Sequence, residues 1–149
     1  MSPQEIEDIY EDQEPEVARS LLLPLAEAGD PVAQFYMGHL CEEETPSNKE
    51  AAIAWYRKSS AGGLLDGTHY LASFLYYGFG APQNIDEALR LFESAANAGL
   101  DASQWKLGQH LLTVAGRRDE AIQWLNRAAV QGHPAAVELL ASLGSDKNA

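Results

Sequence analysis

Histidine is the residue of this sequence best suited to acid–base or metal chemistry, and it occurs four times, at His39, His69, His110 and His133. No two of them form a His-Glu-x-x-His pair or another local spacing typical of zinc ligands. Two histidines without an oriented carboxylate are weak evidence for a metal site. The sequence therefore predicts no metal, no cofactor and no catalytic residue among the histidines.

The possible nucleophiles also lack their usual surroundings. Cys41 is the single cysteine, which excludes an intramolecular disulfide, and Glu42 to Glu44 follow it directly. Neighbouring carboxylates raise a thiol pKa, and no basic residue adjacent in the sequence opposes them. We therefore expect Cys41 to be unreactive.

Serines and glycines give no stronger catalytic signal. Ser59, Ser60 and Ser94 lack the glycine elbow that exposes a hydrolase serine. Gly78-x-Gly80 lacks the lysine and the serine or threonine of a phosphate-binding loop. We expect the serines to serve helix packing and the two glycines to connect helices.

A periodic pattern of small residues is the dominant feature of the chain. Glycines recur at intervals of 34, 36 and 33 residues, and an alanine stands eleven residues before each. A period of this length is typical of helix-turn-helix units that bury their apolar faces by stacking on one another. The glycines are Gly29, Gly63, Gly99 and Gly132, and the alanines are Ala18, Ala52, Ala88 and Ala121.

Each unit contains two helical patterns with large and small residues at fixed positions. In the second helix, a large side chain is followed by a small pair, and we expect Trp55, Phe92 and Trp124 to fill the space beside those pairs. In the first helix, long apolar residues form the predicted core stripe. Gly38 and Gly108 follow that stripe and predict close helix crossings, since glycine costs a helix about 1 kcal/mol relative to alanine. The small pairs are Ser59-Ser60, Ala95-Ala96 and Ala128-Ala129, and the stripe is Met37, Leu71 and Leu107.

The segment from Tyr76 to Ala88, reading Tyr-Tyr-Gly-Phe-Gly-Ala-Pro-Gln-Asn-Ile-Asp-Glu-Ala, resembles a Sel1-like repeat. This family is related to the tetratricopeptide repeat and has a longer Gly-x-Gly connection between its helices. The resemblance covers about residues 17 to 142, although residues 42–48 and 115–119 replace that connection in the first and third units. It implies an all-α fold, an α-solenoid of stacked antiparallel helix pairs in a right-handed superhelix.

The chain is expected to be one domain by length, with three segments. Residues 1–16 form an acidic N-terminal segment or a capping helix, and Ile6, Ile9 and Tyr10 in it have helical spacing. Residues 17–143 hold about three and a half repeats. Residues 144–149 form a polar C-terminal tail.

The resemblance also implies that the first helix of each unit lines a concave face that binds a partner. Positions offset by two from the core stripe, and those one turn further on, are expected to point into it. The alternative is that Phe35 and Trp105 are core residues between helices. The predicted partner-binding residues are Phe35, His39, Glu42, His69, Ser73, Tyr76, Tyr77, Trp105, Gln109 and Leu112.

The charge of the chain restricts its partners. The net charge is −12, and the first sixteen residues contain seven acidic and no basic side chains. Nucleic-acid binding is disfavoured because it depends on neutralising phosphates, whereas a basic protein partner is favoured. No apolar run is long enough to span a membrane and the first residues do not resemble a signal peptide, so we expect no membrane contact and a cytoplasmic location.

These observations predict a non-enzymatic module that binds a protein or peptide. An alternative is a small acidic immunity protein that neutralises a basic toxin. A hydrolase or a small-molecule-binding protein is a further alternative, without a nucleophile and base that the sequence identifies. A weak homodimer through the C-terminal repeat is also possible, because Val137 and Leu140 lack an expected cover.

Overall fold

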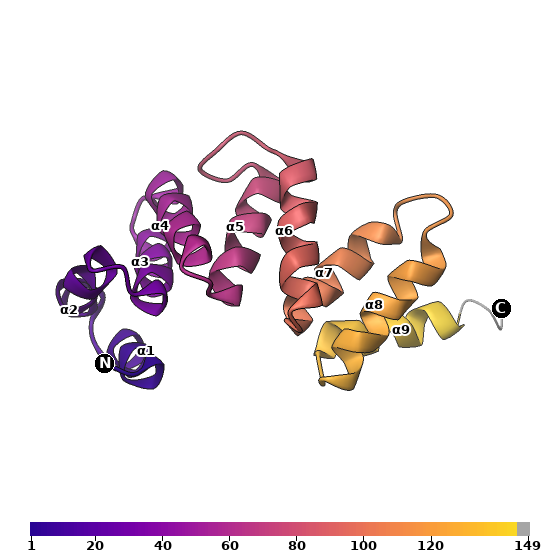
Figure 1. Ribbon diagram of the computed structural model, residues 1–149, viewed down its shortest axis with the longest axis horizontal. Coiled ribbons are helices and arrows are strands. Elements are labelled where there is room, and N and C mark those ends of the chain that lie inside the picture. Colours follow the sequence, from indigo (N-terminus) through magenta and orange to yellow (C-terminus); the bar gives the residue numbers. More distant parts are fainter. Residues whose placement is uncertain (146–149) are drawn as a thin grey trace. The chain divides into compact units, whose positions relative to one another are not determined.

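The computed structural model describes residues 1–145, and these residues form nine helices and no strand (Figure 1). The predicted all-α fold is therefore confirmed. The helices are α1 (Pro3–Asp12), α2 (Pro15–Glu27), α3 (Pro31–Glu43), α4 (Lys49–Ala61), α5 (Leu65–Tyr77), α6 (Ile85–Asn97), α7 (Asp101–Leu111), α8 (Arg118–Val130) and α9 (Pro134–Ser145).

The chain divides into two compact units, residues 1–88 (unit 1) and residues 89–149 (unit 2), with the boundary inside α6. The length of the chain predicted a single domain. In a repeat protein, however, contacts are made mainly between successive helices. These contacts can therefore group into more than one compact unit along the chain. In unit 1, α2 packs on α3, α3 on α4 and α4 on α5. In unit 2, α7 packs on α8 and α8 on α9.

Prolines and the periodic glycines mark the helix boundaries. Pro31 and Pro134 begin α3 and α9, as suits their fixed φ. The carboxylate of Asp30 caps α3 by accepting hydrogen bonds from the backbone N–H groups of Val32 at 2.9 Å and Ala33 at 3.0 Å. The periodic glycines lie in the left-handed region that ends helices, with φ of 98°, 90°, 104° and 88° at Gly29, Gly63, Gly99 and Gly132.

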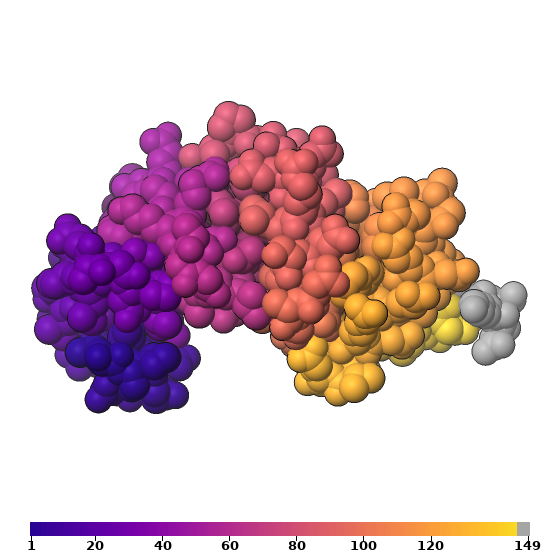
Figure 2. Space-filling model, in the orientation of Figure 1, coloured from indigo at the N-terminus to yellow at the C-terminus, as the bar shows by residue number. Residues whose placement is uncertain are grey.

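The acidic N-terminal segment contains α1, which packs on both α2 and α3 (Figure 1, Figure 2). Ile6 of α1 is fully buried in a cluster with Leu22 and Met37. The first helix of the chain thus contributes to the core of unit 1. Helix α2 begins at Pro15, before the expected start of the repeat region at residue 17.

The predicted core stripe of the first helices is buried at Met37, Leu71 and Leu107. In the second helices, the fully buried large residues are Leu22, Tyr56, Phe92 and Leu125, which occupy one repeat position. Trp55 is only half-buried and packs against the core cluster of unit 1, while the adjacent Tyr56 is fully buried. Trp124 is buried as expected, with 9% of its surface exposed.

At the C-terminal end, α9 extends to Ser145, so Gly144 and Ser145 of the predicted polar tail are helical. The rest of that tail, residues 146–149, lies outside the described residues. Val137 on α9 is 49% exposed, and Leu140 is half-buried.

Candidate functional site

Unit 1 contains a group of aromatic rings from four helices, here called the aromatic cluster. The rings of Phe35 and His39 on α3 are 4.5 Å apart, and Tyr70 of α5 is 4.7 Å from His39. Tyr10 of α1 stacks on Tyr36 of α3 at 4.7 Å. The cluster therefore joins the first helices of two successive repeats and the N-terminal helix. Its members are Tyr10, Phe35, Tyr36, His39, Tyr56 and Tyr70.

Carboxylates border the aromatic cluster and accept hydrogen bonds from its hydroxyl groups. The hydroxyl of buried Tyr56 donates to Oε1 of Glu42, which also lies 3.9 Å from Nδ1 of His39. The hydroxyl of Tyr10 donates to Oε1 of Glu43 at 2.5 Å. Both carboxylates come from the end of α3, so this helix supplies aromatic and acidic groups together.

The protonation of the cluster is shifted by burial and by these carboxylates. Burial lowers the pKa of His39, although Glu42, Glu43 and Asp66 oppose that effect. Burial, followed by the charge and hydrogen bonding of Glu42, raises the pKa of Tyr56. The neutral forms of His39 and Tyr56 are thus favoured, and the charge around them, from the carboxylates, is negative.

Tyr36 and Tyr70 show the same pattern. Burial raises the pKa of both, and the next causes are carboxylates: Glu7 for Tyr36, and Glu42 followed by Asp66 for Tyr70. The carboxylate neighbours belong to α1, α3 and α5, so acidic groups reach the cluster from three helices.

The predicted partner-binding residues of α5 lie at two different places along the helix. His69 lies 5.8 Å from Tyr70, next to the aromatic cluster, and Ser73 is half-buried. Tyr76 and Tyr77 lie at the end of α5 with their rings 5.1 Å apart. There Tyr77, 49% exposed, stacks on Phe79, and the ammonium group of Lys49 lies over Phe79 at 4.0 Å from its centroid.

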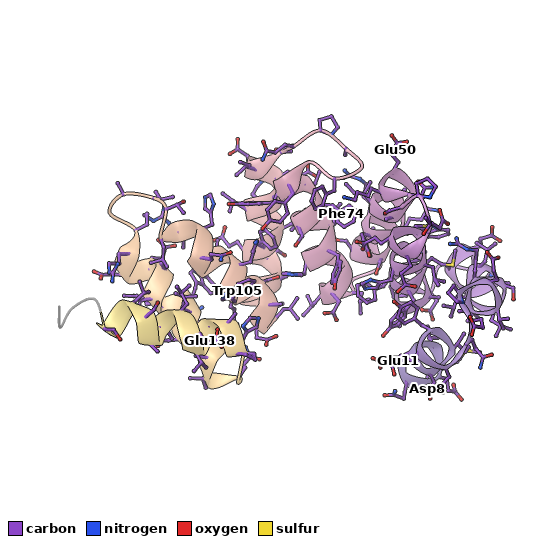
Figure 3. All side chains as sticks on the ribbon, turned by 180° about the vertical axis from the view of Figure 1, so that it is seen from behind. Asp8, Glu11, Glu50, Phe74, Trp105 and Glu138 are labelled. Carbon is purple, nitrogen blue, oxygen red and sulfur yellow. The ribbon has the colours of Figure 1, made fainter. Side chains whose placement is uncertain are left out.

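In unit 2, a pocket of about 380 Å³ lies between α7 and α9. Trp105 contributes its ring and stacks on His133 at 5.1 Å, and Gln109 follows it on α7. Trp105 also packs on the core cluster of Leu125, so it is both a core and a pocket residue. The residues that line the pocket are Trp105, Gln109, Ala135, Glu138, Leu139 and Ser142, and Figure 3 labels Trp105 and Glu138.

The unit 2 pocket follows the repeat register. Glu138 and Ser142 stand six and ten residues after Gly132, as Trp105 and Gln109 stand after Gly99. The residues predicted from the sequence do not include the α9 pair, although the same register identifies it. Leu112, which is among the predicted residues, instead packs against both apolar clusters of unit 2.

Most of the aromatic cluster is also absent from the residues predicted from the sequence. Tyr36 and Tyr70 stand seven residues after Gly29 and Gly63, so a recurrent tyrosine beside the selected positions was a usable signal. Tyr56 is on a second helix and Tyr10 precedes the repeats, so no repeat register connects either with that tyrosine position.

Cys41 has a basic neighbour in space that the sequence does not reveal. Burial raises the thiol pKa, as Glu44 does to a smaller extent. Arg19 of α2 lies 3.9 Å from its sulfur and lowers that pKa, although no basic residue is adjacent in the sequence. The net direction is upward, as the sequence predicted.

Within residues 1–145, no group of three or more histidine, cysteine, aspartate or glutamate side chains is arranged to hold a metal ion. Across the same described range, no helix combines the length and apolar character needed to cross a membrane.

The repeat register, the paired helices and the glycine connections agree with the family model of the Sel1 repeat, which matches residues 31–64, 65–100 and 102–133. The chain belongs to the Sel1 repeat family. The three matches begin at or next to the first residues of α3, α5 and α7. Members of this family are generally protein–protein interaction modules.

Similar proteins support this assignment. An uncharacterised protein of Neisseria meningitidis serogroup B is 32% identical over 120 residues, which are 79% of this chain and 25% of that protein. A protective antigen of uropathogenic Escherichia coli strains, with an SLR fold, is 28% identical with a TM-score of 0.74, over 85% of this chain and 28% of its own. This chain thus spans about a quarter of the length of each.

A Sel1 repeat protein from Oxalobacter formigenes has the same fold, with a TM-score of 0.80 at 24% identity. The match covers 91% of this chain and 57% of that one. It supports the helical-repeat architecture that the sequence predicted.

Proposed function

We propose that this protein is a non-enzymatic module that binds a protein or peptide partner on the side chains of its first helices. The observation that carries this proposal is the aromatic cluster of unit 1, where partly exposed rings from α3 and α5 lie beside carboxylates. Aromatic side chains give large contact areas at low entropic cost, and bordering charges select the partner.

The unit 2 pocket supports the same proposal independently. It lies between two successive first helices, and its lining combines Trp105 with Gln109 and Glu138. A tryptophan beside polar groups is a common centre of protein recognition. Partner binding would therefore use equivalent repeat positions in both units.

A second candidate function is an immunity protein that neutralises a basic toxin. The net charge of −12 favours this candidate, because an acidic inhibitor is steered electrostatically toward a basic enzyme. Its test is the association rate with the identified partner at increasing ionic strength, together with the activity of that partner. An unchanged rate, or a partner that retains its activity in the complex, would reject this candidate.

An enzymatic function has less support. His39 is surrounded by aromatic rings and lies 3.9 Å from Oε1 of Glu42, which accepts a hydrogen bond from Tyr56. The neighbours described for that imidazole within residues 1–145 are aromatic rings and the Glu42 carboxylate, which do not supply a nucleophile. We therefore propose binding rather than hydrolysis.

The experiment is affinity capture from cells of the source organism with a face variant and a matched control. The face variant, Asp66→Lys with Glu138→Lys, reverses one exposed charge on a first helix in each unit. The control, Glu50→Lys with Glu93→Lys, makes the same change on the exposed surface of second helices. We expect proteins retained by the wild type and the control to be lost with the face variant. Equal retention by all three would contradict the proposal.

A further inference from the structure

The net negative charge of this protein comes from one unit. Residues 1–88 contain sixteen acidic and four basic residues, whereas residues 89–149 contain six of each. Unit 1 therefore has the whole net charge of the chain, −12, and unit 2 has none. A positively charged partner is therefore attracted to unit 1.

All four basic residues of unit 1 contact groups outside the aromatic cluster. Arg19 pairs with Glu44 at 2.6 Å, and Arg57 lies 3.4 Å from Glu87. The ammonium groups of the two lysines lie over other rings, Lys49 on Phe79 and Lys58 on Trp55. The carboxylates that act on the aromatic cluster are thus not neutralised by these four side chains.

The aromatic cluster offers both kinds of group that hold a guanidinium. Phe35, Tyr36 and Tyr70 are partly exposed rings that provide π faces and edges. Glu42 is 32% exposed at its side chain, and Asp66 is exposed beside the same rings. A planar guanidinium can stack on an aromatic ring while its N–H groups bind a carboxylate in a bidentate manner, which an ammonium group cannot do.

We infer that the aromatic cluster of unit 1 binds an arginine side chain of the partner, between the partly exposed rings and the carboxylates of Glu42 and Asp66. This inference rests on the proposed function and names the chemistry that the partner presents. The hydroxyl of Tyr56 keeps the Glu42 carboxylate beside His39, so the anionic group is positioned before the partner arrives. The neutral state of His39, which burial favours, avoids repulsion of the incoming cation.

The test uses the whole chain and a defined probe, the capped peptide Gly-Gly-Arg-Gly-Gly, in an NMR titration. The matched control peptide has citrulline in place of arginine, which keeps the shape and removes the charge. We expect resonances of His39, Tyr36 and Tyr70 to shift with the arginine peptide, and the citrulline peptide to bind at least about tenfold more weakly. Equal affinity for the two peptides, or shifts confined to other residues, would overturn the inference.

Two protein variants locate the site. Glu42→Gln removes the charge but keeps an oxygen that accepts the Tyr56 hydrogen bond. It should lower the affinity for the arginine peptide about three- to tenfold. Glu50→Gln removes the same charge from α4, where Figure 3 shows the side chain pointing outward, and it should change the affinity less than about twofold. Equal effects of the two variants would contradict a local site. If Glu42→Gln does not fold, Asp66→Asn replaces it as the site variant, and a change below about twofold would then overturn the inference.

The outcome is distinguishable from failure of the proposed function. If the arginine peptide does not bind but partner capture still depends on Asp66 and Glu138, the interaction proposal stands and the arginine site is wrong. If the peptide binds the aromatic cluster but no protein depends on the first helices for capture, the proposed function is wrong and the cation site remains.

Discussion

Gly38 of α3 lies directly against the ring of Tyr56 on α4. A β-carbon built at Gly38 would overlap Cε1 of that ring and lie 2.8 Å from both Cδ1 and Cζ. Gly108 of α7 has the same relationship to α8, with Cγ of Leu125 at 2.8 Å. The predicted close helix crossings are thus confirmed, and Tyr56 can point its hydroxyl at Glu42 because no side chain separates the two helices.

Gly38→Ala should destabilise unit 1. Alanine favours a helix, but here its methyl group overlaps a fully buried ring, and overpacking typically costs about 1–3 kcal/mol. The free energy of unfolding, measured with denaturant, should fall. The matched control is Gly144→Ala in α9, where nothing lies within 4 Å, and it should be neutral or stabilising by up to about 1 kcal/mol. Stabilisation by both variants would disprove the close crossing.

Tyr56→Phe should lower the free energy of unfolding by about 1–2 kcal/mol, because it removes a hydrogen bond to the carboxylate of Glu42 from a fully buried side chain. A double-mutant cycle with Glu42→Ala, which removes the acceptor oxygen, isolates the pair, and we expect a coupling of about 1 kcal/mol. Additive effects of the two substitutions would show that the hydrogen bond contributes nothing to stability.

Alkaline pH should unfold unit 1 by ionising its tyrosines. Burial, reinforced by carboxylates, raises the pKa of Tyr10, Tyr36, Tyr56 and Tyr70 in the folded state. A raised pKa gives stability that is complete below the unfolded value of about 10 and is lost as pH rises toward the folded values. Ultraviolet titration of tyrosinate should show these groups ionising together with the loss of helical circular dichroism. Their complete ionisation in a folded chain would contradict this prediction.

Acid should destabilise the folded chain by protonating His39. Burial lowers its pKa, against the smaller opposing effects of Glu42, Glu43 and Asp66. The unfolded chain then binds the proton more readily, so the contribution of His39 is complete above about pH 6.5 and is lost as pH falls through its folded value. An NMR titration of the imidazole should give a midpoint below about 6.5. A higher midpoint would mean that the carboxylates outweigh burial.

The candidate site was predicted only in part, for a physical reason that its residues make clear. Register along the repeat selects Trp105 and Gln109 together, and both line the unit 2 pocket, because positions one turn apart on a helix share a face. Leu112 has that register too, yet it packs on the core at the end of α7. The contacts that Leu112 makes with these clusters decide its position, and repeat register does not specify them.

By itself, the sequence determined the helix pairs and their boundaries, because these depend on residues near one another in the chain: glycines with positive φ, prolines at first turns and small residues at a fixed period. Only the tertiary structure decided which groups meet across helices. It brought Tyr10 to Glu43, Arg19 to Cys41 and Tyr56 to Glu42, contacts separated by 33, 22 and 14 residues. Such contacts depend on packing geometry in three dimensions, which local periodicity does not encode.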